Sequence, residues 1–143
     1  MIEYLATHQD SGAWTVTVLD QDEKALRAKC APYPHIHAEG ADLSESDVRE
    51  AWIQRADVVV SMLPAFMHIE VAKACLTHRK HLVTASYVSP EMQALHEEAK
   101  ALGLIFLNEC GVDPGIDHMS TMEILEKLRA KGAEITSYES FCG

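Results

Sequence analysis

Short runs of hydrophobic and β-branched residues alternate along the chain with longer segments of helical spacing. The strand-like runs lie at 14–19, 35–38, 57–63, 81–85, 104–107 and 135–141. Between them, apolar residues recur three and four positions apart near 2–6, 25–30, 48–52, 67–75, 89–103 and 122–132. Strands that alternate with helices in this way are typical of right-handed βαβ crossovers. The pattern therefore predicts the α/β class, with a doubly wound parallel sheet and helices on both of its faces.

Two segments carry the clearest local signals. Residues 57–64 read DVVVSMLP, a continuous apolar run closed by proline, which is typical of a strand buried on both faces of a parallel sheet. Ser89, Pro90 and Glu91 fit an N-cap, a first helical position and a first-turn acid, and Gly103 fits a helix end. These signals predict one helix between Ser89 and Gly103.

Charge and length narrow the partners that the chain can have. It has 143 residues, with 12 Lys and Arg against 22 Asp and Glu, for a formal net charge of −10. Such a surface does not neutralise nucleic-acid phosphates or anionic lipid headgroups. No apolar run is long enough to span a bilayer. We therefore expect a small-molecule ligand, with no nucleic acid and no membrane.

The four cysteines are scattered without a C-x-x-C pair, which favours reduced thiols. Cys110 precedes a glycine, but nothing marks a base beside it, so we interpret it as a small buried hydrophobe rather than a nucleophile. The first residues show no basic and apolar signal pattern. Together these features predict a cytoplasmic location.

Histidines occur as two close pairs, His35 with His37 and His78 with His81. Neither pair has a third ligand at a useful spacing. We interpret all four as exposed loop residues, and we predict no metal site.

In an open parallel sheet, ligands bind beyond the carboxyl ends of the strands. Asp20 ends the strand at 14–19 and could accept hydrogen bonds from both ribose hydroxyls of an adenosine. It could equally be a surface acid that caps the next helix, and both interpretations stay open. Gly111, Pro114 and Gly115 form a tight bend before a helix, which could hold a phosphate, an amide or a carboxylate or could be a plain turn.

Three segments together resemble the saccharopine dehydrogenase (saccharopine reductase) family. They are ADVVVSMLP at 56–64, HLVTASYVSP at 81–90 and NECGVDPGIDH at 108–118, and the resemblance extends from about residue 15 to residue 143. It implies a Rossmann-like fold and a nicotinamide-dependent oxidoreductase of lysine metabolism. Such enzymes oxidise a secondary amine, so that saccharopine, NAD(P)+ and water give glutamate and 2-aminoadipate 6-semialdehyde.

The resemblance also implies site residues. Those expected to bind the cofactor are Asp20, Asp42, Leu43, Met62, Leu63, Ser86, Gly115 and His118. Those expected to bind the substrate are Ser86, Tyr87, Asp113 and Cys142, of which Tyr87 and Asp113 would be catalytic. The general base stays open, because the substrate amine can give its proton to water, to Asp113 or to Tyr87.

The cofactor is expected to be NAD or NADP. Gln21 follows Asp20 where an arginine would bind the 2′-phosphate of NADP, which favours NAD. An arginine in a glycine-rich loop elsewhere in the protein would reverse this preference.

One departure from the family concerns the phosphate loop. Gly12 is the only glycine before Gly40, so no G-x-G-x-x-G motif precedes Asp20. The first strand and the glycine-rich loop of the fold are therefore expected to be missing from this chain. That strand is central in the order 3-2-1-4-5-6, so we predict that the strands of Val16 and Val59 are separated, with unpaired backbone groups between them.

The division that follows is a partial dinucleotide-binding domain at 1–132 and the start of a substrate domain at 133–143. We expect the parent protein to be an enzyme, the fragment alone to be inactive, and any homodimer to form through the missing domain. Two alternatives stay open. One is a non-catalytic remnant that binds a nucleotide or a partner, and the other is a family member that acts on carboxynorspermidine or homospermidine.

Overall fold

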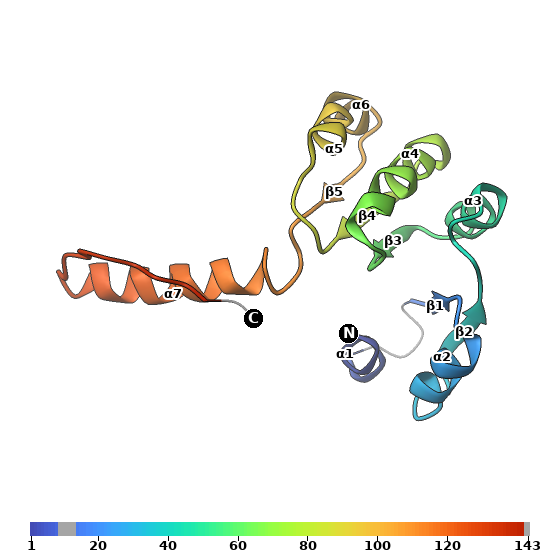
Figure 1. Ribbon diagram of the computed structural model, residues 1–143, viewed down its shortest axis with the longest axis horizontal. Coiled ribbons are helices and arrows are strands. Elements are labelled where there is room, and N and C mark those ends of the chain that lie inside the picture. Colours follow the sequence, from blue (N-terminus) through green and yellow to red (C-terminus); the bar gives the residue numbers. More distant parts are fainter. Residues whose placement is uncertain (9–13, 142–143) are drawn as a thin grey trace. The chain divides into compact units, whose positions relative to one another are not determined.

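A computed structural model of the chain describes residues 1–8 and 14–141 (Figure 1). Its elements in chain order are α1 (Ile2–Thr7), β1 (Val16–Asp20), α2 (Glu23–Cys30), β2 (Ile36–Gly40), α3 (Ser46–Gln54), β3 (Val58–Ser61), a short 3₁₀ turn (Ala65–Met67), α4 (His68–His78), β4 (His81–Thr84), α5 (Pro90–Ala94), α6 (His96–Ala101), β5 (Phe106–Leu107) and α7 (Ile116–Ala130). Every strand pair is parallel. The predicted α/β class is confirmed.

The described strands form two sheets. In one, β1 pairs with β2, and in the other the order is β3-β4-β5. No pairing in the described part of the chain joins the strand of Val16 to that of Val59, as predicted. The unpaired backbone groups expected between them stay a prediction. The chain divides into two compact units, Met1–Ala51 and Trp52–Gly143, with one sheet in each.

The first unit packs α1 and α2 with its two-stranded sheet. Its buried core is Ala6, Leu26, Cys30 and Ile36, against which Val16 and Val18 of β1 pack. Val16 and Val18 lie two positions apart and therefore point to the same face of the strand. The ring of His35 also contacts the Ala6 carbonyl oxygen, with Nε2 at 3.0 Å. This contact joins the end of α1 to the start of β2.

The second unit packs α4 and α5 on one face of its three-stranded sheet. The registers align Val59, Leu82 and Phe106 across the three strands. Leu82 is 1% exposed and belongs to a core that includes Val71, Cys75 and Met92. Full burial of a leucine side chain contributes about 1.5–3 kcal/mol. On the other face of the sheet, Val58, Val60 and Leu107 are exposed, so the burial on both faces predicted for the strand at 57–64 is wrong.

Several boundaries differ from the prediction. Residues 135–141 are not a strand, because no described strand offers them a partner; they run back beside α7, where the hydroxyl groups of Tyr138 and Thr121 lie 2.8 Å apart (Figure 1). The helix predicted from Ser89 to Gly103 is two helices. Its N-cap is confirmed, since Ser89 Oγ accepts a hydrogen bond from the Met92 N–H. The helix is interrupted at Leu95, whose side chain packs against the core.

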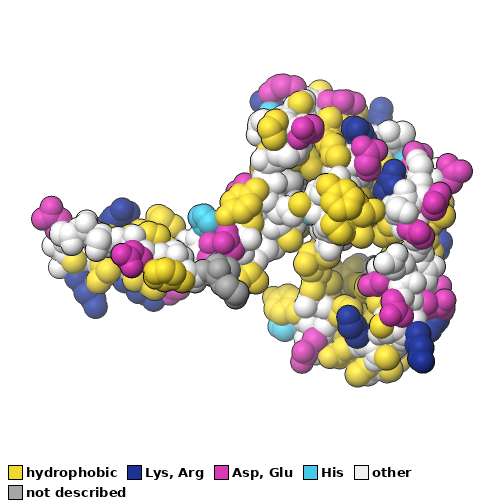
Figure 2. Space-filling view, in the orientation of Figure 1, with side chains coloured by type: hydrophobic (Ala, Val, Ile, Leu, Met, Phe, Trp, Pro, Cys, Tyr) yellow, Lys and Arg dark blue, Asp and Glu magenta, His cyan; other side chains and the backbone are white. Residues whose placement is uncertain are grey.

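Helix α7 is the least packed element of the second unit. It begins at Ile116, inside the segment expected to be loop, and none of its residues is buried. Ile116, Met119 and Ile124 are each more than half exposed. Figure 2 shows hydrophobic side chains along this helix, interspersed with charged ones. In the described ranges no helix combines the length and the apolar character needed to cross a bilayer.

Candidate functional site

The carboxyl ends of β3, β4 and β5 meet at one edge of the second sheet, because the three strands are parallel. Ser61 ends β3, directly opposite Thr84, which ends β4. Asn108 follows the last residue of β5. Ser61 and Thr84 are both almost completely buried. Their polar groups need partners within the protein, and the partners they find define the site.

One of these partners is His68, the first residue of α4. Its Nδ1 lies 2.8 Å from Ser61 Oγ, and its Nε2 lies 3.0 Å from Ser86 Oγ. His68 is 4% exposed, and burial lowers its pKa, which favours the neutral ring. A buried imidazole therefore links the end of β3 to Ser86, two residues after the end of β4.

Thr84 binds the segment that follows β5. Its hydroxyl donates to Asn108 Oδ1 at 3.0 Å, and its carbonyl oxygen accepts from the Cys110 N–H. The next turn is held in a similar way, since the Glu109 N–H donates to the Ser86 carbonyl oxygen and the Glu109 carboxylate accepts from the Val88 N–H. Asn108 to Cys110 are thus fixed to the end of β4 by backbone and side-chain hydrogen bonds.

The predicted bend is a compact loop closed on itself. The Gly111 N–H donates to the Pro114 carbonyl oxygen at 2.8 Å, and the Ile116 N–H donates to the Gly111 carbonyl oxygen at 3.0 Å. The peptide bond between Asp113 and Pro114 is cis. Gly115 has φ of 146°, and a Cβ there would lie 2.2 Å from the Gly111 oxygen. Only glycine fits this position.

The loop brings Asp113 to Tyr87. The Tyr87 hydroxyl donates to Asp113 Oδ1 at 2.5 Å, across 26 residues of sequence. This hydrogen bond, together with burial and the nearby acidic groups, raises the pKa of Tyr87 to about 12. Tyr87 is therefore a hydrogen-bond donor at neutral pH, and Asp113 is the acceptor of the pair.

A second acid, Asp117, closes the start of α7. Its Oδ1 accepts from the Gly115 N–H at 2.9 Å and lies 2.7 Å from His118 Nδ1. Burial raises the pKa of Asp117, but hydrogen bonds from His118 and Gly115 outweigh it and leave a net lowering. The same bond raises the pKa of His118. Possible metal-ligand atoms of Asp113, Asp117 and His118 lie within 4.8 Å of one another. The hydrogen bond of Asp113 with Tyr87 and those of Asp117 with Gly115 and His118 account for this arrangement.

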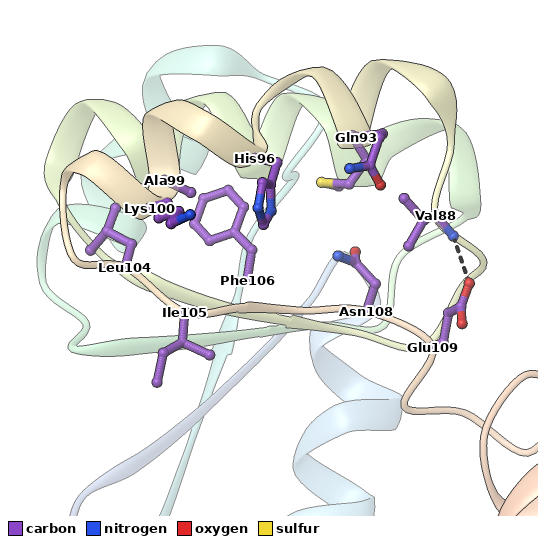
Figure 3. A pocket seen from close by; sticks show the side chains of 11 residues that line it. Val88, Gln93, His96, Ala99, Lys100, Leu104, Ile105, Phe106, Asn108 and Glu109 are labelled. Atoms are coloured by element: carbon purple, nitrogen blue, oxygen red, sulfur yellow. Dashed lines mark hydrogen bonds between the residues drawn. The ribbon is translucent and has the colours of Figure 1, made fainter.

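A hollow lies between α5, α6 and β5, beside the strand ends (Figure 3). Phe106 and Leu104 point into it, whereas Ile105 points the opposite way. Asn108 and Glu109 border the hollow at the end nearest the site. It therefore has an apolar floor and a polar rim. The rim belongs to the polar groups described above at and after the carboxyl ends of β3, β4 and β5, which we call the strand-end cluster.

The predicted adenosine side lies in the first unit. Asp20 Oδ1 accepts from the Asp22 N–H at 2.9 Å, and it is Asp22 that caps α2 by accepting from the Ala25 N–H. Asp42 Oδ1 accepts from the N–H and the hydroxyl of Ser44, and these bonds lower its pKa. Both acids are exposed and hold local turns.

The other predicted residues differ in their surroundings. Met62 is 61% exposed, whereas Leu63 packs against the buried core of the second unit. Leu43 is half-buried, and its carbonyl oxygen accepts a hydrogen bond from Arg49. Cys142 lies outside the described residues. Asp20, Asp42 and Leu43 belong to one unit and the remaining described residues to the other.

The interpretations of Cys110 and of three of the four paired histidines are wrong. His37 is exposed but lies in β2, and His78 is the half-buried last residue of α4. Cys110 is exposed, because it sits in the loop after β5 rather than under a helix. His81 is half-buried in β4, and its Nδ1 accepts from the Ile105 N–H at 3.0 Å. It is a structural residue of the sheet and not a loop residue.

His68 is the residue that the sequence analysis missed. A signal was present, because His68 lies three, four and seven positions before Val71, Ala72 and Cys75, on the buried face of α4. A histidine on an apolar helix face needs a hydrogen-bond partner. Nothing in the local pattern identifies Ser61 and Ser86 as the partners.

Comparison with known proteins places these features in a family. The family described as saccharopine dehydrogenase NADP binding domain matches residues 1–107, and the one described as saccharopine dehydrogenase C-terminal domain matches residues 111–143. The two matches meet at the loop after β5. The division after residue 132 stays a prediction.

Individual relatives agree with these matches. An alpha-aminoadipic semialdehyde synthase of Arabidopsis thaliana is 44% identical over 108 residues, which cover 76% of this chain and 10% of that protein. The NADP(+)-dependent, L-glutamate-forming saccharopine dehydrogenase of Schizosaccharomyces pombe is 34% identical over 142 residues, or 99% of this chain and 31% of that protein.

A solved structure shows the same fold. The apo saccharopine dehydrogenase (L-Glu forming) of Saccharomyces cerevisiae superposes with a TM-score of 0.75 at 29% identity. The superposition covers 92% of this chain and 28% of that one. The chain thus spans less than a third of these relatives. The Schizosaccharomyces pombe relative is named for NADP(+), which differs from the preference for NAD inferred from Gln21.

Proposed function

Because the chain belongs to the saccharopine dehydrogenase family, we propose that it forms the cofactor-binding part of an NADP-dependent oxidoreductase of lysine metabolism. The substrate of the whole protein is saccharopine or a related secondary amine. A bound NADP would supply the acceptor for hydride from the carbon beside the amine, and water would hydrolyse the oxidised product; from saccharopine the products would be glutamate and 2-aminoadipate 6-semialdehyde.

The contact between Tyr87 and Asp113 is the observation that carries this proposal. It joins two of the segments on which the family resemblance rests, at the edge of the sheet where ligands bind. A carboxylate beside a protonated phenol suits a substrate amine, because the carboxylate accepts from the amine while the phenol fixes its orientation. Asp113 Oδ2 has no hydrogen bond within the described residues, so it is the oxygen that would face the amine.

The adenosine end of the cofactor would contact the first unit. Asp20 uses Oδ1 for the Asp22 N–H, which leaves Oδ2 for a ribose hydroxyl. Asp42 and Leu43 follow β2 and would flank the adenine. Ser86 would contact the nicotinamide end.

Titration of the 143-residue chain with NADPH and NADH, by calorimetry and by saturation-transfer NMR, tests the proposal. We expect NADPH to bind, with magnetisation transfer to both its adenosine and its nicotinamide protons. Asp20→Ala should weaken NADH binding about tenfold or more, as loss of a hydrogen bond to a charged group does, and should weaken NADPH binding less, because NADPH carries a phosphate in place of the 2′-hydroxyl. The matched control is Asp47→Ala, which removes the same charge from an exposed helix position. Absence of transfer from either end of NADPH would contradict the proposal.

A second candidate is a non-catalytic nucleotide-binding protein. The observation that favours it is that no G-x-G-x-x-G motif precedes Asp20, since the backbone amides of such a loop would hold the cofactor phosphates. Binding of adenosine fragments without any transfer from the nicotinamide ring would support this candidate over the first.

Two further proposals concern the setting of the protein. A homodimer is testable by sedimentation, and a cytoplasmic location by fractionation of cells. Both stay predictions from the sequence.

A further inference from the structure

His68 sits between two serine hydroxyls that come from different strand ends. Ser61 Oγ lies 2.8 Å from Nδ1 and Ser86 Oγ lies 3.0 Å from Nε2. His68 and Ser61 are 4% and 3% exposed, while Ser86 is half-buried and faces the strand-end cluster. The three groups therefore form a short chain with one closed end and one open end.

The closed end determines the direction of the hydrogen bonds. A neutral imidazole has one N–H donor and one acceptor nitrogen. If Nδ1 carried the proton and donated to Ser61 Oγ, the buried Ser61 hydroxyl would have no acceptor for its own hydrogen among the described residues. An unsatisfied buried donor is unfavourable. The favoured state therefore has Ser61 donating to Nδ1, so that the ring proton is on Nε2 and is donated to Ser86 Oγ.

We propose that His68 is a positioning residue that makes Ser86 a hydrogen-bond donor toward the ligand at the end of β4. With one lone pair of Ser86 Oγ occupied by the ring N–H, the Ser86 hydroxyl hydrogen points away from His68. It can donate to an acceptor oxygen of a ligand, and in the proposed oxidoreductase the carboxamide oxygen of the nicotinamide would supply such an acceptor. This part of the inference rests on the proposed function.

The hydrogen-bonded series Ser61–His68–Ser86 does not move protons to or from the site. Ser61 is buried, and its hydroxyl bonds to no described group other than His68, so a proton entering at Ser86 has no exit. His68 therefore acts by fixing the orientation of Ser86, and its effect is on binding of the nicotinamide end.

The tautomer is the first test, and it needs no cofactor. Long-range ¹H–¹⁵N NMR of the 143-residue chain at neutral pH should show His68 in a single Nε2–H tautomer, assigned by the signal that disappears in His68→Gln. Ser61→Ala removes the donor to Nδ1 and should release the ring to a mixture of tautomers. A wild-type His68 that is protonated, or that carries its proton on Nδ1, would overturn the inference.

The second test compares two substitutions that each retain half of the ring's contacts. The amide of His68→Gln reaches the Nε2 position and can still donate to Ser86, whereas that of His68→Asn reaches only the Nδ1 position. We expect His68→Asn to weaken NADPH binding about three- to tenfold, the usual range for one hydrogen bond, and His68→Gln to stay within about twofold of the wild type. Adenosine 2′,5′-bisphosphate, which lacks the nicotinamide, should bind all forms equally.

His37→Asn, at an exposed position of β2, is the control for loss of a histidine. Equal effects of His68→Asn and His68→Gln on NADPH, or equal losses with the bisphosphate, would overturn the positioning role. Failure of the wild-type chain to bind NADPH would instead contradict the proposed function, and the tautomer measurement would still decide the state of His68.

Discussion

The predicted acids of the first unit and the polar groups at the strand ends of the second unit are held in different ways. Asp20 and Asp42 accept hydrogen bonds from groups only two residues away. Tyr87 and Asp113 are 26 residues apart, and His68 and Ser86 are 18 apart. The first arrangement forms wherever a local turn forms. The second forms only when the sheet and the loop after β5 have folded together, because distant groups must be brought into place at an entropic cost.

The most direct way to break the second arrangement is Gly115→Ala. The new methyl group would lie 2.2 Å from the Gly111 oxygen and 2.8 Å from the Gly111 nitrogen. We expect a loss of about 3–5 kcal/mol in the free energy of unfolding, measured by urea denaturation, since backbone atoms must move. Gly132→Ala is the control. Its φ is also positive, at 76°, but no atom lies within 4 Å of the added Cβ, so it should cost about 1 kcal/mol.

Thr84→Val tests the link between the two strand ends. The side chain is 2% exposed, and valine retains its shape while removing the hydroxyl that donates to Asn108. We expect a loss of about 1–3 kcal/mol, because the half-buried Asn108 amide loses its partner. Thr77→Val, at an exposed position of α4, should change stability by less than about 0.5 kcal/mol. Equal effects of the two substitutions would contradict a link through Asn108.

Asp113→Asn sharpens the comparison at a single hydrogen bond. The Tyr87 pKa of about 12 should fall toward its ordinary value of 10.0 when the carboxylate is replaced. Because the pKa of Tyr87 is raised in the folded state, the hydrogen bond stabilises the folded protein fully below pH 10. This stabilisation is lost as the pH rises through about 12. Ultraviolet titration of the tyrosinates checks this, with Tyr87→Phe identifying the residue among the four tyrosines. An unchanged titration in Asp113→Asn would show that the two side chains do not pair in solution.

The smallest expected effect is at His118, whose partner is its neighbour Asp117. At pH values between the lowered pKa of Asp117 and the raised pKa of His118, both side chains are charged. The contribution of His118 to the free energy of unfolding is complete below its ordinary pKa of 6.5. It is lost as the pH rises through the raised pKa. NMR titration should show the His118 pKa falling in Asp117→Asn, and high salt should reduce the difference, since His118 is exposed.

The two pKa effects also separate local from long-range contacts within one variant. In Gly115→Ala the raised pKa of His118 should survive, since adjacent residues make that pair. The raised pKa of Tyr87 should be lost, since it requires the loop to reach β4. If both shifts survived, the loop would not depend on Gly115.

Much of the fold could be predicted from residue patterns. The N-cap Ser89 and the alternation of strands with helices are local features, and each has the expected structure. The apolar run of β3 is a strand as expected, but burial on both of its faces was not a local feature, and Val58 and Val60 are exposed. The separation of the sheets could also be predicted, because no strand or glycine-rich loop precedes Val16 in the described chain. Residues 135–141 have the composition of a strand, but strand structure requires a partner strand, which composition does not supply.

The sequence by itself determined the class of the fold, the local turns that hold Asp20 and Asp42, and the motifs that place the chain in its family. These depend on residues a few positions apart, whose steric and hydrogen-bonding preferences act on the backbone between them. Only the tertiary structure decided that His68 lies between Ser61 and Ser86, that Tyr87 donates to Asp113 and that Cys110 is exposed. Those outcomes depend on which distant groups the parallel strands and the loop at Gly111–Gly115 bring together, and spacing along the chain carries no record of that choice.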